Sequence, residues 1–157
     1  MLPLADAEQR ILDSVVSLEA ETYKIGYQQC AVSDGCLHPQ NPLDAKFSLP
    51  FTLAGALVLG QVDQSLFTPE KVADPAIQTM LGRIRVREAA DLTAAYPGHW
   101  SCRVKVQLKD GRVLGQFIQD PTGSYRKPLS EEAALQKAEG LLANVYPTRP
   151  PRWRESY

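Results

Sequence analysis

The sequence lacks the features that mark several broad classes of protein. It has only three cysteines among 157 residues, an odd number and too few for a disulfide framework, so free thiols in a reducing cytoplasm are expected. No apolar run approaches the roughly 20 residues that span a bilayer. The N-terminal residues combine neither a basic region nor a long apolar stretch, so no signal peptide is expected. These absences indicate a cytoplasmic protein without a membrane partner.

Neither sign of charge is in excess. The chain has 17 lysines and arginines against 18 acidic residues, a net charge of -1. A nucleic-acid-binding face needs a basic excess, so no nucleic-acid partner is expected. The length and the 44% of hydrophobic residues suit a single domain with its own core. We place this domain at residues 1–146 and interpret residues 147–157, which are rich in proline and arginine, as an extended tail.

Three stretches alternate apolar and polar residues with the period of two that is typical of half-buried strands. Their apolar positions are Val16, Leu18, Ala20 and Thr22; Ile84 and Val86; and Cys102, Val104, Val106 and Leu108. Asp110-Gly111 directly follows the third stretch and predicts a two-residue hairpin turn into a return strand over residues 112–119.

Helix-start signals lie before, between and after these strands. They predict helices over residues 6–14, from about 45 or 49 to 59, after Thr68, after Asp74, and from Ser130 to about 145, with a loop over 31–43. The Asp74-Pro signal either opens a new helix or bends the one before it. Strands segregated from helices, with a hairpin, indicate an α+β fold. We expect a two-layer sandwich whose mostly antiparallel sheet is covered by helices on one face.

The most informative segment is residues 44–60, where polar groups stand just before an apolar run of helical length. Lys46 and Ser48 could bind the carboxylate or hydroxyl of a polycarboxylic acid, because a lysine supplies a point charge and a helix start adds free N–H groups. Alternatively, Asp44 and Ser48 cap the helix while Lys46 is solvated. For Ser48 the two interpretations stay open.

Other polar residues do not form a recognisable catalytic or metal-binding set. Cys30, Cys36 and His38 lie close together, but their spacing is not usual for zinc ligands, so we expect no metal. His99 has no identifiable partner for base catalysis and is interpreted as a loop histidine. Cys102 is interpreted as a core residue. The arginines at 83, 85 and 87 alternate with apolar residues and are interpreted as the solvent face of a strand rather than a phosphate site.

Four motifs resemble, in order and spacing, those of the MmgE/PrpD family. Ala45-Lys-Phe-Ser-Leu-Pro-Phe-Thr-Leu-Ala54 is similar to its A-x-F-S-L-P-[YF]-x-x-A signature. Val104 to Gly111 resembles its V-x-V-x-L-x-D-G hairpin, and Ser124 to Glu131, with Lys137 further on, resembles its P-L-S segment. Phe67-Thr-Pro-Glu-Lys and Asp74-Pro resemble the stretch between them. The resemblance covers about residues 15–145.

The resemblance implies chemistry on small di- or tricarboxylates without a redox cofactor. Family members include 2-methylcitrate dehydratases of propionate catabolism, cis-aconitate decarboxylases and iminodisuccinate epimerases, which abstract a proton next to a carboxylate. In the family a large helical domain carries catalytic histidine and a smaller C-terminal domain covers it as a lid. This chain resembles most of that lid, N-terminally incomplete, without the K-x-Y-P…H segment. The implied substrate-binding residues are Lys46, Ser48 and Phe51, and no catalytic residue is assigned.

Two further expectations follow. The resemblance implies that the chain is inactive without a helical domain; the alternative is a non-catalytic stand-alone domain that binds a ligand or another protein. Phe51 stands where many members have a tyrosine, and a phenyl ring cannot exchange a proton. Residues 49–59 are apolar nearly all round, so part of this helix is expected to be exposed without a cover. We therefore expect a homo-oligomer or a partner chain, with this helix and the last helix near the contact.

Overall fold

The computed structural model describes residues 13–143. Contacts divide the chain into two units at Gln119 and Asp120, and we describe each by itself. Most of the predicted first helix, and the whole predicted tail with Arg149, Arg152, Arg154 and Trp153, lie outside the described residues.

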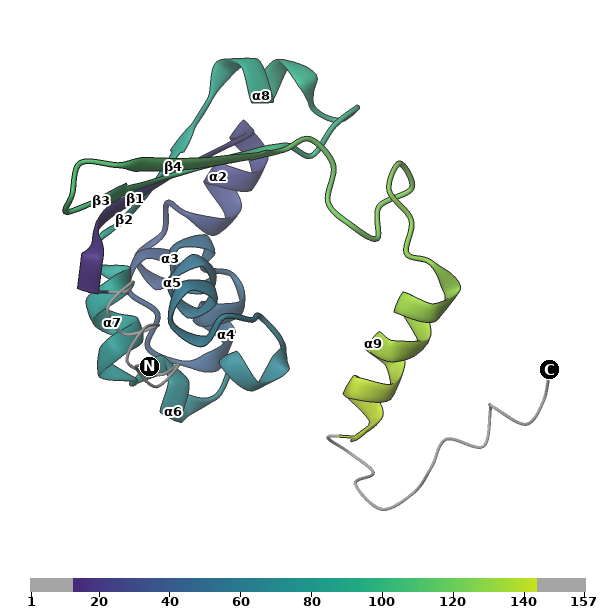
Figure 1. The fold of residues 1–157 in the computed structure, drawn as a ribbon, viewed down its shortest axis with the longest axis horizontal. Coiled ribbons are helices and arrows are strands. Elements are labelled where there is room, and N and C mark those ends of the chain that lie inside the picture. The colour runs from purple at the N-terminus through teal and green to yellow at the C-terminus, as the bar shows by residue number, and fades with distance from the viewer. Residues whose placement is uncertain (1–12, 144–157) are drawn as a thin grey trace. The chain divides into compact units, whose positions relative to one another are not determined.

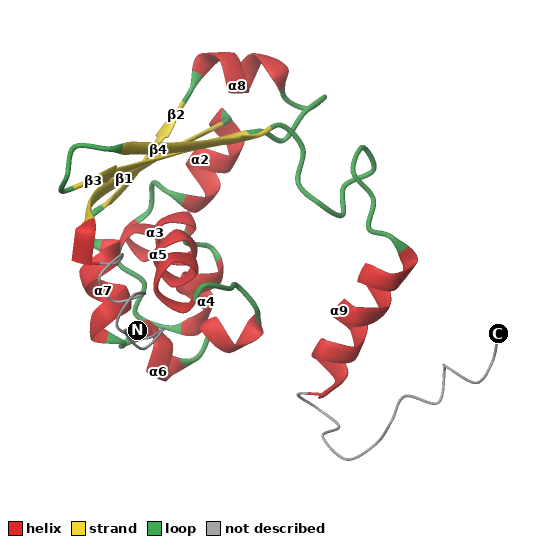
Figure 2. Cartoon of the chain, viewed as in Figure 1, coloured by secondary structure: helices red, strands yellow, loops and turns green. Residues whose placement is uncertain are grey.

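The first unit is built on a four-stranded sheet in the order β2-β1-β3-β4. The strands are β1 (Val15–Thr22), β2 (Ile84–Glu88), β3 (Cys102–Leu108) and β4 (Val113–Ile118). β1 pairs parallel with β2 and antiparallel with β3, and β3 pairs antiparallel with β4. The sheet is therefore mostly antiparallel, and the predicted α+β class is confirmed (Figure 2).

The predicted alternation sets the two faces of the sheet, with one correction in β1. Leu18 and Ala20 are buried in the core as predicted, but Val16 is exposed and Val15 takes its buried place. The physical reason is a register shift between Val15 and Ser17, which inserts one extra residue into β1. As a result, the side chains before the shift point to the opposite faces of the sheet from those predicted. The hairpin differs too: the N–H of Leu108 donates to the carbonyl of Arg112, which closes a three-residue loop rather than the predicted two-residue turn.

The helices of the first unit are short, apart from α5 (Leu49–Leu59). They are α2 (Lys24–Cys30), α3 (Asp34–Leu37), α4 (Pro42–Lys46), the 3-10 helix η1 (Gln64–Leu66), α6 (Pro69–Val72), α7 (Pro75–Leu81) and α8 (Ala90–Ala95). Helices α3 to α7 lie together on one side of the sheet (Figure 1). α8 follows β2 and contacts α2 and β1.

Capping side chains explain where these helices start. Ser33 and Asn41 cap α3 and α4, so the segment predicted as a loop over residues 31–43 contains helical turns. Thr68 and Asp74 cap α6 and α7, which shows that the two start signals open two separate helices. Gly60 ends α5 with a left-handed φ of 71°.

α5 lies at the centre of the core. Phe51 and Ala54 are completely buried, in a cluster that includes Leu66 and Ile77 from the helices and Leu18 from the sheet. Gly55 permits the close approach of Leu66, because a Cβ at Gly55 would stand 2.6 Å from Leu66 Cδ2. The other side chains of α5 are half-buried or buried, so its uncovered surface is smaller than its apolar sequence suggested.

The second unit contains α9 (Glu131–Ala143). Its start agrees with the prediction, since the Ser130 hydroxyl accepts a hydrogen bond of 3.1 Å from the N–H of Ala133. Glu131 and Glu132 lie in the first turn, where negative charge is favourable.

Candidate functional site

The junction of α4 and α5 carries the polar residues singled out from the sequence. Asn41 caps α4 through hydrogen bonds from the N–H groups of Leu43 (2.9 Å) and Asp44 (3.0 Å). Asp44 in turn accepts a bond of 2.8 Å from the Asn41 amide. Asp44 therefore stabilises the start of α4, and Lys46 lies at the other end of the same helix.

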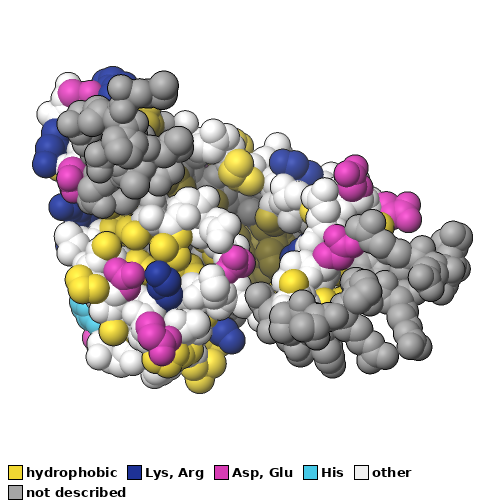
Figure 3. All heavy atoms as spheres, turned by 60° about the horizontal axis from the view of Figure 1, so that its bottom comes forward, with side chains coloured by type: hydrophobic (Ala, Val, Ile, Leu, Met, Phe, Trp, Pro, Cys, Tyr) yellow, Lys and Arg dark blue, Asp and Glu magenta, His cyan; other side chains and the backbone are white. Residues whose placement is uncertain are grey.

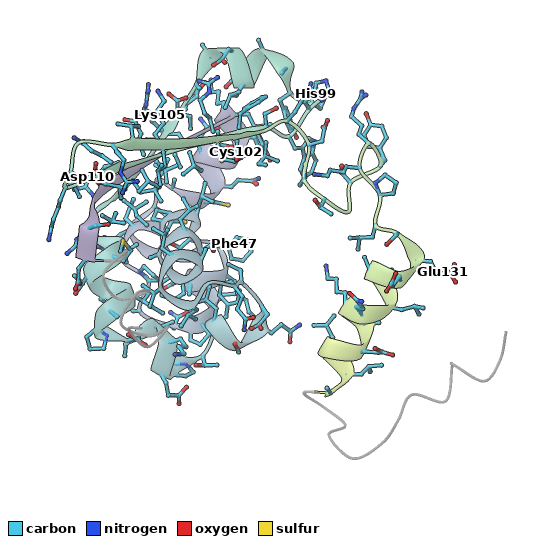
Figure 4. The ribbon with its side chains drawn as sticks, in the orientation of Figure 1. Phe47, His99, Cys102, Lys105, Asp110 and Glu131 are labelled. Carbon is cyan, nitrogen blue, oxygen red and sulfur yellow. The ribbon has the colours of Figure 1, made fainter. Side chains whose placement is uncertain are left out.

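Lys46 is exposed at the last residue of α4. A cation is favoured there by the partial negative charge of a helix C-terminus. Phe47 follows it and is 57% exposed, and Figure 4 shows its place beside α5. Within residues 13–143 no carboxylate lies within ion-pair distance of the Lys46 ammonium group, so its charge is available to an anion.

Ser48 is buried, with 1% of its surface exposed. Its hydroxyl accepts a hydrogen bond of 3.0 Å from the N–H of Phe51 and donates one of 2.5 Å to the carbonyl oxygen of Cys36. The residue is thus the N-cap of α5 and ties α3 to α5. Of the two interpretations open from the sequence, the structure shows the capping contacts; contact between Ser48 and a substrate stays a prediction.

Phe51 has no exposed surface. Its ring packs against Phe67, with the ring centroids 6.4 Å apart and the planes tilted by 44°. The phenyl group therefore supports the first turn of α5 from within the core. Its predicted place against a substrate is likewise untested.

A groove of about 500 Å³ lies on another side of the α5 start, where sequence reasoning did not anticipate one. Its lining residues are Tyr27, Ala31, Val32, Leu37, His38, Pro50, Gln78, Leu81, Gly82, Ile84, Arg85 and Val86. They come from α2, α3, α5, α7 and β2 and from the turns beside them, so no local sequence pattern could reveal the groove. Its walls expose polar and apolar surface in nearly equal parts, and His38 and Arg85 contribute basic side chains.

The remaining candidates have structural partners. Cys36 is buried and its thiol donates to the carbonyl of Gln29, while burial raises the pKa of the Cys30 thiol, with a smaller effect of Cys36. His99 lies 3.2 Å from the side-chain nitrogen of Gln119. Among residues 13–143 no group of His, Cys, Asp and Glu side chains is arranged to hold a metal ion.

Sequence reasoning also missed a charge network on the solvent face of the sheet. Glu21 is only 5% exposed, and its carboxylate pairs with Arg87 of β2 on one side and with Arg103 of β3 on the other. Arg87 also pairs with Glu19 at 2.9 Å, and Arg103 with Asp91. The hydrogen bond from Arg103 holds the pKa of the Asp91 carboxyl below its usual value. Arg87 thus lies on the solvent face of the sheet, as predicted, and forms ion pairs with β1.

The surface elsewhere mixes both signs of charge. Figure 3 shows basic and acidic side chains interspersed with apolar ones on the face that it displays. No helix in the described part of the chain is both long and apolar enough to cross a membrane.

Comparison with known proteins gives this arrangement a family. Residues 2–155 match the MmgE/PrpD C-terminal domain, so the chain belongs to that family and the resemblance of its motifs is confirmed. A cis-aconitate decarboxylase of Mus musculus is 23% identical over 99 residues. The matched stretch covers 63% of this chain and 20% of that enzyme's length.

Proposed function

We propose that this chain forms part of the wall of an active site that binds small di- or tricarboxylates. The parent activity would be that of a lyase or isomerase that dehydrates, decarboxylates or epimerises its substrate after proton abstraction next to a carboxylate. The observation that carries this proposal is the exposed ammonium group of Lys46 at the junction of α4 and α5, inside the family's signature segment.

Each signature residue has a distinct role in this proposal. Lys46 neutralises a substrate carboxylate, which favours substrates with more than one negative charge. Ser48 orients the segment through its bonds to Phe51 and Cys36, and touches the substrate only if the junction opens. Phe51 stabilises the segment from below. The base that removes the proton comes from a helical domain, in the same or another chain, which this domain covers.

The proposed partners follow from the same chemistry. They are a polycarboxylate substrate and a helical domain, with no metal, redox cofactor, nucleic acid or membrane involved. A cytoplasmic location and a place in propionate catabolism belong to this proposal as well, because one family activity is 2-methylcitrate dehydration.

Binding by the chain itself provides the test. Amide chemical shifts are followed by NMR while cis-aconitate or 2-methylcitrate is added, with monovalent acetate as the reference anion. We expect shifts at Lys46 to Phe51 that disappear in Lys46→Gln and persist in Lys109→Gln, a matched change at an exposed lysine of the hairpin. Shifts of equal size in both variants would remove the proposed role of Lys46.

A second candidate, a stand-alone ligand-binding domain, is favoured by the groove beside α5. Its volume lies in the range of small-molecule sites, and walls of mixed polarity with a few basic groups suit a ligand with one carboxylate and an apolar body. Benzoate serves as the probe in the same NMR experiment. Saturable shifts at Leu37, His38 and Arg85, with none at Lys46, would favour this candidate over the first.

A further inference from the structure

β4 is an edge strand that lacks the features which normally prevent pairing with another strand. It lies at one end of the sheet order, and all six of its residues are exposed. Val113, Leu114, Phe117 and Ile118 are 61, 53, 49 and 41% exposed. Edge strands are normally protected by charged residues, proline or bulges. β4, Val-Leu-Gly-Gln-Phe-Ile, contains neither a charge nor a proline, and its pairing with β3 shows no bulge.

The backbone groups that face the open edge can be identified. The N–H of Leu108 donates to the carbonyl of Arg112, so these opposed residues form a hydrogen-bonded pair. Because the direction of backbone groups alternates along an antiparallel strand, Leu114, Gln116 and Ile118 also point their N–H and C=O groups towards β3. Val113, Gly115 and Phe117 therefore direct theirs to the open edge.

We propose that β4 pairs antiparallel with β4 of a second copy of this chain, about a two-fold axis at Gln116. The two sheets then continue into one sheet of twice the width. Gly115 and Phe117 exchange backbone hydrogen bonds across the axis with Phe117 and Gly115 of the second copy. This uses the groups that face outward, and it places Gln116 opposite its own counterpart.

The side chains match in this register. Leu114 lies opposite Ile118 of the second copy, apolar against apolar, on the face of the sheet that the helices cover at β1 and β2. On the other face each Phe117 ring lies beside the bare Gly115 of its neighbour, a cross-strand combination that shields glycine backbone.

A neighbouring register that also engages the outward-facing groups matches less well. A two-fold axis at Gly115 preserves the hydrogen-bonding direction, but it places Leu114 against Gln116 and Arg112 against Ile118. Such pairs set apolar side chains against polar or charged ones. At the Gln116 axis the residues of β4 complement other residues of the same strand, so a second copy of this chain fits better than an unrelated strand.

The expected dimer is weak. Stable interfaces bury about 1,200–2,000 Å², and a single pair of six-residue strands buries less. The Arg112–Asp110 ion pair at the end of the strand is exposed, so its rearrangement on pairing changes the energy little. Association is therefore expected between micromolar and millimolar concentration.

Sedimentation velocity of the full 157-residue chain over that range gives the first test. Leu114→Lys replaces the apolar partner of Ile118 of the second copy with a charged side chain, once in each copy, and should weaken association roughly tenfold or more. Leu43→Lys, the same change at another exposed leucine, should leave association unaltered. Circular dichroism verifies that both variants fold. A parent chain that stays monomeric, or a dimer equally weakened by both changes, would refute the proposal.

Cysteine cross-linking tests the register. Directly opposed residues in a pair without backbone hydrogen bonds have Cα atoms about 4.5 Å apart, within the roughly 4.4–6.8 Å that a disulfide spans. Gln116→Cys should therefore form a covalent dimer under mild oxidation. Gln107→Cys, an equivalent change at an exposed residue of β3, and the unmodified chain with its three cysteines should not. Cross-linking through Gly115→Cys with none through Gln116→Cys would overturn the proposed axis.

Discussion

Replacing Ser48 by alanine separates the structural role of the signature segment from its proposed role in binding. The substitution removes two hydrogen bonds at once: the cap on the Phe51 N–H and the bond to the Cys36 carbonyl. No other hydroxyl replaces them, because alanine has no polar atom. α5 then loses its N-cap and its connection to α3.

The cost follows from the environment of each bond. Loss of a serine N-cap costs about 1 kcal/mol. The Cys36 carbonyl stays buried without this partner, which costs a further 1–2 kcal/mol or so. We expect Ser48→Ala to lower the free energy of unfolding by about 2–3 kcal/mol in total. This corresponds to a fall in Tm of roughly 6–10 °C for a chain of this size.

Urea denaturation followed by circular dichroism measures this difference. Thr68→Ala is the matched control, since Thr68 caps α6 through a bond of 3.3 Å from the Lys71 N–H, whereas the Ser48 hydroxyl also donates to a carbonyl of another helix. It should cost about 1 kcal/mol. A loss for Ser48→Ala no larger than that for Thr68→Ala would refute the buried bond to Cys36. It would also favour the interpretation that the main role of Ser48 is to bind a ligand.

The remaining predictions use other parts of the first unit and the whole chain. Gly55→Ala should lower the free energy of unfolding by about 1 kcal/mol, because the new Cβ overlaps the side chain of Leu66. Gly140→Ala places a Cβ with nothing within 4 Å, so it should increase the helicity of α9 measured by circular dichroism. Glu21→Gln leaves two arginines without their shared buried carboxylate and should cost about 2 kcal/mol in urea denaturation; an unchanged midpoint would contradict this. Burial raises the pKa of the Cys102 thiol, so its alkylation rate should reach half its maximum at a higher pH than that of a free thiol; a midpoint at the free-thiol value would argue against burial. The isolated chain should not turn over cis-aconitate, 2-methylcitrate or iminodisuccinate, since about four-fifths of the related decarboxylase lies outside the matched stretch; turnover abolished by Ser48→Ala would place the active site in this domain.

Local chemistry in the sequence determined where most elements begin and end. The alternation from Cys102 to Leu108 predicted β3 because side chains of a strand point to opposite faces. Pro50 and Gly60 predicted the first turn and the end of α5, since a proline in the first turn and a left-handed glycine act within a few residues. The start, left open between about 45 and 49, falls at Leu49 because Ser48 caps the helix. The family signature is of the same kind, because it consists of neighbouring residues in one segment.

Properties that depend on distant partners could be decided only by the tertiary structure. The shift at Val15 arises from pairing with β3, more than eighty positions away in the chain. The second bond of the Ser48 hydroxyl, to the Cys36 carbonyl, depends on how α3 packs against α5. The groove beside Pro50 and the burial of Glu21 between two arginines bring together segments that are far apart in sequence. Sequence patterns record which residues a backbone segment prefers to bury, whereas long-range packing decides what each buried or exposed group meets.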